Sequence, residues 1–447
     1  MSCLAVFLFA AVLMFTPKKY TVLKGGTLID GKGIIPIENS LVILEDDKIK
    51  SISQLRDTKI PFPAKVINAK GRYIIPGLVD MHVHCTEESF LPLFLINGVT
   101  AIRDVGNNID FILTLRDEVN SGLRIGPSLF VAGYMINNRK IPFGASQHTA
   151  VIRNIKEAQK AVTLLAQRKV DWIKIYITLP KGVVRRVLFE ADKFGIPVAG
   201  HLRKVDARFA AQWGISTIEH ATGIAEALLG DEEFEDAPPL QTISNKTWLH
   251  VDRTKYDELI DLFIEKNVFI HANLTLYESF TLPVEKIRNK PFVELIPPTI
   301  VEGWDLYLSK QFLEVTQDKE SWRITKERLE EFLIMFKEKG GKVLAGTDTP
   351  WPYLLPGFSL HRELELLVET GFTPMEAIWT ATKYAAEALK QENNIGTLTE
   401  GKRADIVLLN SNPLEDIRAL RDIHHVIKDG RIVKRKELLR SLRKNGF

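Results

Sequence analysis

The sequence predicts an α/β fold: a (β/α)8 TIM barrel with a small β-sandwich domain formed from both ends of the chain. Two observations lead to this prediction. Short apolar runs alternate with helix-like segments across residues 77–390, which is the pattern of parallel strands joined by crossover helices. Strand-like sequence flanks this region at residues 20–76 and 391–435. A single β domain built from both flanks brings the two ends of the chain together beside the barrel.

The N-terminal flank contains short strands separated by turn signals. Asp46 and Asp47 lie between the strand-like segments 40–44 and 48–52, which predicts a hairpin. Gly25 and Gly26 follow another short strand-like segment, and Asp30-Gly31 is a strong signal for a tight turn. We therefore expect several short strands rather than helices before residue 77.

The barrel prediction depends on eight apolar runs, with helix-like segments such as 154–167, 183–194 and 325–339 between them. The runs span residues 78–84, 99–105, 128–131, 172–177, 197–201, 217–220, 268–274 and 343–348. Eight units over about 310 residues fit a (β/α)8 barrel with insertions. The longest insertions, 221–266 and 275–320, follow the sixth and seventh runs. We expect them to cover the catalytic face, where loops carry specificity.

Composition excludes several classes of protein. The chain has 447 residues, 45% of them hydrophobic and 26% charged, which is the balance of an ordinary globular enzyme. Lys and Arg total 59 against 56 Asp and Glu, a formal net charge of +3, so no nucleic acid partner is expected. Two cysteines, Cys3 and Cys85, are too few for a disulfide framework. A large apolar core must therefore stabilise the fold.

Residues 1–19 form an apolar N-terminal segment. Twelve consecutive apolar residues, 4–15, precede Lys18 and Lys19. This run is shorter than the roughly 20 residues of a membrane-spanning helix and fits a signal or anchor. The protein would then be secreted or associate with the membrane at the cell envelope. If translation starts at Met14 instead, the protein is cytoplasmic, and the sequence leaves both alternatives open.

Residues 436–447 form a basic C-terminal tail. The stretch 428–447 contains eight basic and two acidic residues, a net charge of +6. A solvated terminal helix accounts for this charge. The alternative is a weak electrostatic contact with an anionic membrane surface.

Polar residues that can bind metal ions end several of the predicted barrel strands. His82 and His84 close the first run, and two residues apart on a strand point to the same side. Lys174 lies within the fourth run, and the fifth, sixth and eighth runs end at His201, His220 and Asp348. The carboxyl ends of barrel strands form the catalytic face. Histidine and carboxylate are ligands for zinc or a similar divalent ion, so the pattern predicts a metal site there.

These residues carry a resemblance to the amidohydrolase superfamily that covers nearly the whole chain. The order H-x-H, Lys, His, His, Asp on eight β/α units is similar to its pattern, as are residues 77–84 (GLVDMHVH) and 401–407 (GKRADIV). Residues 356–369 (PGFSLHRELELLVE) resemble more narrowly the prolidase-like and imidazolonepropionase-like members.

The resemblance implies a centre with two divalent metal ions, with zinc expected. His82, His84 and Asp348 would bind one ion and His201 and His220 the other, with a carboxylated Lys174 bridging them. A carbamate is an anionic oxygen ligand, whereas a protonated lysine would repel the metals. An unmodified, salt-bridged lysine is the alternative. In the implied reaction a hydroxide bridging the ions attacks the carbonyl, and Asp348 carries the proton to the leaving amine.

Several neighbouring residues have alternative interpretations. Asp80 shares the strand face of His82 and can orient a ligand or serve a structural partner. An internal ion pair is favoured for Arg103-Asp104, packing for Cys85, and a satisfied core position for His271. The remaining histidines without a strand-end position, His250, His361, His424 and His425, are interpreted as structural or surface residues.

Substrate recognition is predicted from four side chains that can bind a carboxylate. They are Arg139 and His148 after the third run, Tyr176 beside Lys174, and Arg203 just beyond His201. Prolidase-like members usually carry a Gly-Gly-His-Gly-like segment after the third strand, and this chain has residues 142–148 (PFGASQH) instead. They tend to show Pro-Thr-Leu after the seventh strand, where this chain has Asn273-Leu-Thr.

The sequence therefore predicts a metal-dependent hydrolase cleaving an amide C–N bond, in Xaa-Pro dipeptides or N-acyl amino acids. One alternative is a cyclic-amide hydrolase of the imidazolonepropionase type. An alternative of another class is a non-catalytic barrel scaffold, which predicts loss of the metal set, yet all six residues are present. The expected partner is a small-molecule amide or dipeptide, and homo-oligomerisation is left open.

Overall fold

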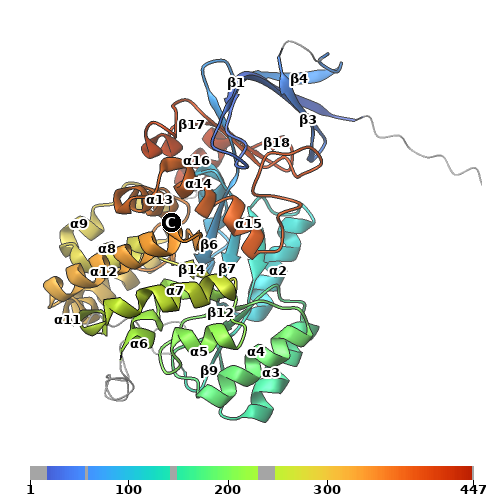
Figure 1. The fold of residues 1–447 in the computed structure, drawn as a ribbon. Helices are drawn as coiled ribbons and strands as arrows, with labels where there is room; N and C mark the ends of the chain where they lie inside the picture. The colour runs from blue at the N-terminus through green and yellow to red at the C-terminus, as the bar shows by residue number, and fades with distance from the viewer. Residues whose placement is uncertain (1–17, 56–58, 141–147, 230–246, 445–447) are drawn as a thin grey trace, which may run out of the picture.

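The eight predicted runs each contain a strand of a TIM-barrel-like α/β fold. The computed structural model describes residues 18–55, 59–140, 148–229 and 247–444. The barrel strands are β6 (Leu78–Val83), β7 (Val99–Asp104), β8 (Ser128–Val131), β11 (Ile173–Ile175), β12 (Val198–Gly200), β13 (Thr217–Ile218), β14 (Phe269–His271) and β15 (Val343–Leu344). Successive strands pair in parallel, and the alternation predicted from the sequence is confirmed (Figure 1).

Backbone hydrogen bonds join two strand ladders into a closed barrel. One ladder is β6-β7-β8, and the other runs β10-β9-β11-β12-β13-β14-β15. The N–H groups of Asp171 and Trp172 donate to the Val131 carbonyl and join β8 to β11. Met81 N–H donates to Ala345 and Asp348 N–H to His82, which joins the first strand to the last. Two short strands that the sequence did not predict, β9 (Met135–Asn137) and β10 (Thr149–Val151), extend the ladder beside β11.

Helices follow the barrel strands and cover them. They are α1 (Phe90–Ile96), α2 (Ile109–Asn120), α3 (Ile155–Gln167), α4 (Lys181–Lys193), α5 (Ala207–Gln212), α6 (Ile224–Leu228), α7 (Tyr256–Glu265), α12 (Lys319–Glu338), α13 (Phe358–Thr370), α14 (Pro374–Thr380) and α15 (Lys383–Ala388). Asn154 caps α3 by accepting from the Glu157 N–H. Thr373 and Glu376 form a capping box at the start of α14.

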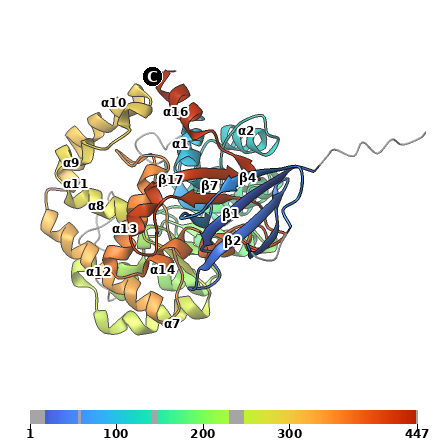
Figure 2. The same cartoon turned by 90° about the horizontal axis from the view of Figure 1, so that it is seen from above.

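The insertion after β14 is helical and lies along one side of the molecule (Figure 2). It consists of α8 (Leu274–Thr281), α9 (Val284–Arg288), α10 (Pro298–Tyr307) and α11 (Leu313–Val315). Helix α8 begins three residues after the end of β14, so this insertion starts directly at the carboxyl end of a barrel strand.

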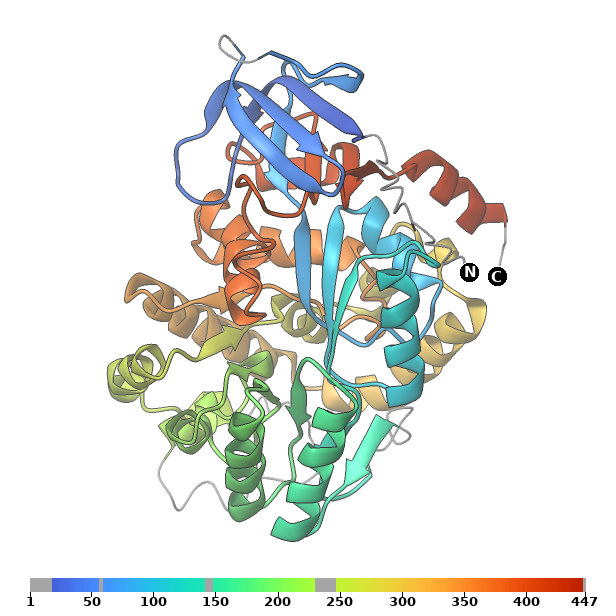
Figure 3. The ribbon, with the colours of Figure 1, turned by 90° about the vertical axis from the view of Figure 1, so that its right-hand side faces the viewer.

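Strands from both ends of the chain form one eight-stranded sheet (Figure 3). The N-terminal strands are β1 (Tyr20–Leu28), β2 (Ile37–Glu45), β3 (Lys48–Gln54), β4 (Ala64–Asn68) and β5 (Tyr73–Pro76), and the C-terminal ones are β16 (Ile406–Leu409), β17 (Ile423–Lys428) and β18 (Arg431–Ile432). Antiparallel pairing of β5 with β16 joins the two groups. Side chains from both groups, such as Leu23, Ile74 and Leu408, share one apolar cluster. The division into a two-layered sandwich and the exact domain boundaries stay predictions.

The glycines of the first strand have a different role from the one expected. Gly25 and Gly26 do not end the strand; they lie inside β1, where the register with β2 shifts. Gly25 has φ +82°, a conformation that glycine adopts without steric cost. The signal at Asp30-Gly31 is part of a loop, residues 29–36, rather than a tight two-residue hairpin. The hairpin at Asp46 and Asp47 is confirmed.

The basic C-terminal segment forms helix α16 (Arg435–Lys444) and is docked by its apolar side. Leu442 is buried in the main core, and Leu438 and Leu439 pack against it. Among the described residues, no helix is both long enough and apolar enough to span a bilayer. The predicted N-terminal segment falls almost entirely on residues 1–17, outside the described residues, so localisation and membrane association stay predictions.

Two turns lock the N-terminal and C-terminal strands of the sheet together. Asp429 and Gly430 form the two-residue turn between β17 and β18, both with positive φ. Gly430 N–H donates to the Ala404 carbonyl, and Ala404 N–H donates to Asp47 in the β2–β3 turn. A Cβ at Gly430 would overlap the carbonyl oxygen of Asp46. The two turns therefore touch backbone to backbone, with no room for a side chain.

We expect Gly430→Ala to destabilise the protein more than Gly71→Ala. Gly71 has φ +72° and Gly430 φ +71°, so the backbone strain of alanine is the same, about 1–2 kcal/mol. Only Gly430 adds a steric overlap, since an added Cβ at Gly71 meets nothing within 4 Å among the described residues. Overpacking of this kind costs a further ~1–3 kcal/mol. Thermal unfolding of both variants measures the difference, and equal losses in Tm would contradict the proposed interlock.

Candidate metal centre

The six predicted metal-binding residues lie at neighbouring barrel strands. His82 is within β6 and His84 follows it directly; Lys174 is the middle residue of β11. His201 follows β12, His220 follows β13, and Asp348 lies four residues beyond β15. His220 and Asp348 have φ of 54° and 60°, a left-handed conformation that is unusual for these side chains and is found at functional sites.

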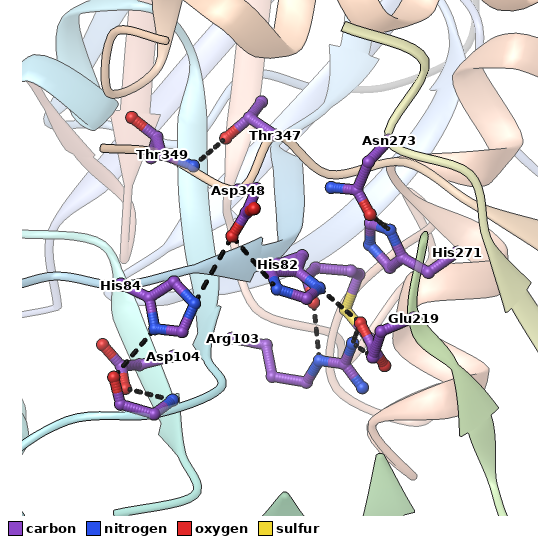
Figure 4. A network of polar contacts seen from close by, with 12 residues as sticks. His82, His84, Arg103, Asp104, Glu219, His271, Asn273, Thr347, Asp348 and Thr349 are labelled. Carbon is purple, nitrogen blue, oxygen red and sulfur yellow. Dashed lines mark hydrogen bonds and ion pairs between the residues drawn. The ribbon is translucent and has the colours of Figure 1, made fainter. Parts of the chain in front are cut away.

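The side chains of these residues converge on one another, and Figure 4 shows three of them, His82, His84 and Asp348. Asp348 Oδ1 lies 3.4 Å from Nε2 of both His82 and His84. The ring centroids of His82 and His220 are 4.4 Å apart, and those of His201 and His220 are 4.7 Å apart. Ligand atoms of His82, His220 and Asp348 all lie within 4.8 Å of one another. The arrangement is that of a cluster able to hold cations.

The cluster is buried on one side and exposed to solvent on the other. His82, His201 and His220 are almost completely buried, whereas the side chain of His84 is 25% exposed. Burial alone would raise the pKa of Asp348, but hydrogen bonds from His82 and His84 are among the influences that hold it well below the ordinary value. Burial lowers the pKa of His220 well below that of free histidine. Asp348 is therefore ionised and His220 is neutral, the states that bind metal ions.

Lys174 lies at this cluster as a buried amine. Its side chain is 1% exposed, and no hydrogen-bond partner reaches Nζ among the described residues. Burial lowers its pKa to about 8, against the opposing effect of Glu219 and the added effect of Arg103. An unpaired buried amine is costly, so the position calls for a ligand or a chemical modification.

Comparisons with known proteins agree with this geometry. The profile of the amidohydrolase family matches residues 73–433. The chain belongs to the amidohydrolase family. It is a hydrolytic enzyme that acts on C–N bonds, and the resemblance to prolidase-like members is confirmed. This family is generally metal-dependent, and the histidine and carboxylate groups at the strand ends supply candidate ligands.

Three relatives illustrate the range within the amidohydrolase family. Ochratoxinase from Aspergillus niger is 22% identical, covering 93% of this chain and 87% of the relative. Imidazolonepropionase from Clostridium tetani is 23% identical over 91% of this chain and 93% of its own length. The solved structure of an Xaa-Pro dipeptidase with bound methionine has a TM-score of 0.69 at 22% identity, covering 93% and 100%. The dipeptidase structure shares its fold with this chain.

Glu219 is the residue of this site that sequence reasoning missed. Its Oε2 lies 2.5 Å from His82 Nδ1, and its carboxylate accepts two hydrogen bonds from the Arg103 guanidinium. Both Arg103 and Glu219 are fully buried. The contact fixes the ring of His82 so that Nε2 faces Asp348. The signal in the sequence was its position immediately before His220.

The pair Arg103-Asp104 does not form the expected ion pair with each other. Arg103 pairs with Glu219, while Asp104 accepts hydrogen bonds from the Cys85 and Gly106 backbone and the Asn107 amide. Adjacent residues on a strand point to opposite faces, so the two side chains diverge. The ion pair is internal, as predicted, but its acidic partner is Glu219, which directly follows β13.

Asp80 forms hydrogen bonds with backbone N–H groups and does not orient a histidine ring. It accepts hydrogen bonds from the Thr347 N–H and hydroxyl and from the His82 N–H. Burial raises its pKa to about 8, which those hydrogen bonds oppose. Asp80 therefore joins β6 to the segment that carries Asp348, the structural alternative of its two interpretations.

The other weighed residues lie partly near the site. His271 is buried, its Nδ1 contacts Asn273 Oδ1 at 2.8 Å, and Nε2 has no hydrogen-bond partner among the described residues. Its ring centroid lies 5.3 Å from that of His82. Cys85 packs in the apolar core, as expected.

Two of the four predicted substrate-binding residues, Tyr176 and His148, lie near histidines of the cluster, and the other two, Arg139 and Arg203, lie near each other. The Tyr176 ring is 4.7 Å from that of His201, and burial raises the pKa of its hydroxyl. Burial lowers the pKa of His148, and the charge of the nearby His84 lowers it further. Burial and the charge of Arg139 lower the pKa of Arg203, which Glu226 opposes. The segment before His148 that departs from the prolidase pattern, residues 142–147, lies outside the described residues.

We expect Arg103→Met to destabilise the metal-stripped protein by about 3–5 kcal/mol, because it leaves the Glu219 carboxylate buried without its cation. Adding Glu219→Gln should recover part of this loss, giving a coupling energy of about 0.5–3 kcal/mol. Urea unfolding in a chelator measures both. Arg168→Met is the control, since its ion pair with Asp110 is exposed and should change stability by less than about 1 kcal/mol. Additive effects of the two buried substitutions would contradict the coupling.

Proposed function

We propose that this amidohydrolase cleaves an amide C–N bond at a centre of two divalent metal ions, in Xaa-Pro dipeptides or N-acyl amino acids. The observation that carries the proposal is the convergence of four histidines and one aspartate around a buried, unpaired lysine. Family membership supports the chemistry, and the names of the relatives support a substrate that pairs an amide with a carboxylate.

The residues fit two cations. His220 Nδ1 and Lys174 Nζ are buried without a hydrogen-bond partner in the described part of the chain. Unsatisfied polar atoms in a dry interior are costly, and ions at the cluster would remove part of that cost. Imidazole nitrogen and carboxylate oxygen are the ligands that zinc prefers when no thiolate is offered. Zinc is therefore the ion we propose.

The proposed arrangement divides the ligands by position. His82, His84 and Asp348 hold one ion, and His201 and His220 hold the other. The Lys174 amine would react with carbon dioxide, releasing a proton, and the resulting carbamate would offer an anionic oxygen ligand to both ions. Because the carbamate is anionic, it also removes the repulsion that a protonated Lys174 would exert on two cations.

When bound, such ions lower the pKa of water and polarise the scissile carbonyl. The protein's own residues do the rest. The ionised Asp348 accepts a proton from the attacking water and delivers it to the leaving amine. Glu219 fixes the orientation of His82 through Nδ1, and Arg103 keeps that carboxylate charged and in place. Arg203, Arg139, His148 and Tyr176 bind the carboxylate of the substrate and orient the amide.

A cyclic-amide hydrolase of the imidazolonepropionase type is the second candidate. The similarity to the imidazolonepropionase over nine-tenths of both chains favours it. A lactam offers the same C–N bond to the site but lacks the separate carboxylated leaving group. Assay of the zinc-loaded protein on Xaa-Pro dipeptides, N-acyl amino acids and lactams distinguishes the candidates; hydrolysis of lactams alone would reject the first.

We expect His201→Ala to reduce the metal content from two ions per chain to one while leaving the fold intact. Only one of the two proposed positions loses a ligand, and the other three-residue set is unchanged. Elemental analysis together with circular dichroism measures the result. His250→Ala, at an exposed histidine, should keep both ions. One ion or fewer in the reconstituted wild type, or unfolding of His201→Ala, would count against the binuclear centre.

Activity should depend on carbon dioxide through Lys174. Metal-free protein reconstituted without CO2 should regain little activity, and bicarbonate should restore it, because the carbamate and the metals stabilise each other. Lys174→Ala should be nearly inactive and partly rescued by acetate, which can occupy the bridging position. Lys174→Arg should resist rescue, since its permanent cation would occupy the place of the anion. A mass spectrum showing unmodified Lys174 in fully active, metal-loaded protein would reject the carbamate.

Arg203→Met should raise KM about tenfold or more for a carboxylated substrate and leave KM for its C-terminal amide nearly unchanged. The reason is that only the carboxylate loses a charged hydrogen-bond donor. Steady-state kinetics on one matched acid and amide pair measures the split. Arg185→Met, at an exposed position of α4, is the control. An equal rise for acid and amide would show that Arg203 does not read the carboxylate.

A further inference from the structure

A separate cavity of about 370 Å³ lies between helices α8 and α13, the segment after α9 and the start of α16. None of the six proposed metal ligands lines it. All of its walls belong to the described residues, and they come from both the barrel and the C-terminal segment. The cavity is therefore distinct from the proposed catalytic centre and has no role in the function proposed above.

Basic side chains gather on its walls: Lys290, Arg362, Arg421 and Arg435. Arg362 is paired with Glu278 and Glu369, and Arg421 with Glu365. No carboxylate lies within ion-pair distance of Lys290 or Arg435 among the described residues; Arg435 donates only to the carbonyls of Ile96 and Ile423. Glu278, which also lines the cavity, and Asp422 influence Lys290 and Arg435 from a longer distance. The cavity thus contains two cations that no described acid pairs with directly.

A buried histidine on the same wall also lacks a partner. His361 is 3% exposed, and neither of its ring nitrogens has a hydrogen-bond partner among the described residues. Burial and the cations Arg421 and Arg435 lower the pKa of its ring, and the Asn97 backbone opposes them. A buried polar ring without a partner calls for an explanation, and a ligand in the adjoining cavity would supply one.

Part of the lining is apolar and includes a strained residue. Phe292 has φ +71°, a genuine outlier for a bulky side chain. Its ring stacks on Phe358 with centroids 4.4 Å apart. Leu282, Ile287 and Leu354 extend this wall. Strain of about 1–3 kcal/mol persists where the surrounding structure holds it, and here it places an aromatic ring over the cavity.

We propose that this cavity binds a small organic carboxylate that carries an apolar group. The apolar part lies against Phe292 and Phe358, and the carboxylate is received by Lys290, Arg435 and His361. The volume suits a ligand of the size of an arylacetate, since small-molecule pockets begin at roughly 300 Å³. A neutral ligand would leave Lys290 and Arg435 without a counter-charge, and a bare inorganic anion would leave the aromatic wall unused.

Titration of 4-fluorophenylacetate followed by fluorine NMR tests the proposal on the metal-loaded protein. We expect saturable binding to the wild type and at least about tenfold weaker binding of the neutral 4-fluorophenylacetamide. Lys290→Met should weaken binding of the acid by a similar factor. Lys286→Met is the matched control, because Lys286 is exposed on α9, the helix directly before Lys290, and does not line the cavity; it should bind as the wild type does.

Each other outcome overturns the assignment. Equal binding of acid and amide would remove the carboxylate from the proposal, and unchanged binding by Lys290→Met would place the acid elsewhere, including the catalytic centre. Tighter binding of inorganic phosphate than of the arylacetate would reassign the ligand class. Absence of saturable binding would reject the site. If Lys290→Met unfolds at a lower temperature, Lys290→Gln repeats the comparison with a polar side chain of similar length.

Discussion

The pairing of the first barrel strand with the last is the constraint on which the proposed centre depends. Asp348 and Thr347 donate their backbone N–H groups to the His82 carbonyl, and Asp80 binds Thr347 across the same junction. These contacts join residues more than 260 positions apart. His82, His84 and Asp348 therefore share a site only in the closed barrel, and their proximity is a product of tertiary structure rather than of a local motif.

Charge burial accounts for much of the remaining design. The interior beside His82 contains Arg103 and Glu219 with no exposure, and the Arg103 guanidinium also stacks on Trp172. A buried ion pair is a weak source of net stability, since desolvation offsets its attraction. Its value here lies in direction: the pair holds one carboxylate against the back of a histidine ring. The desolvation of Arg103 and Glu219 thus costs stability, and its effect is to fix the position of the His82 ring.

The sequence predicted the strand runs, the histidines and Asp348 well, because each depends on a short local pattern. Alternation of apolar and helical segments marks barrel strands, and His82 with His84 reads as one face of a strand. Glu219 escaped because its partners, Arg103 and His82, lie 116 and 137 residues away. Strands β9 and β10 were missed for a similar reason: each is three residues long and exists only through pairing beside β11. Gly25 misled, since a bulge and a strand end use glycine alike.

The pairing of β5 with β16 has a consequence for how the chain emerges during synthesis. Pro76 pairs with Ile406, so 330 residues must follow β5 before its partner strand exists. Until then the N-terminal strands offer an unpaired edge and an apolar face, of the kind that promotes association between chains. At about 5–20 residues per second, that interval lasts tens of seconds. The sheet is thus begun before the barrel and completed after it, and the nascent chain exposes an unpaired sheet edge while the 330 residues of the interval are synthesised.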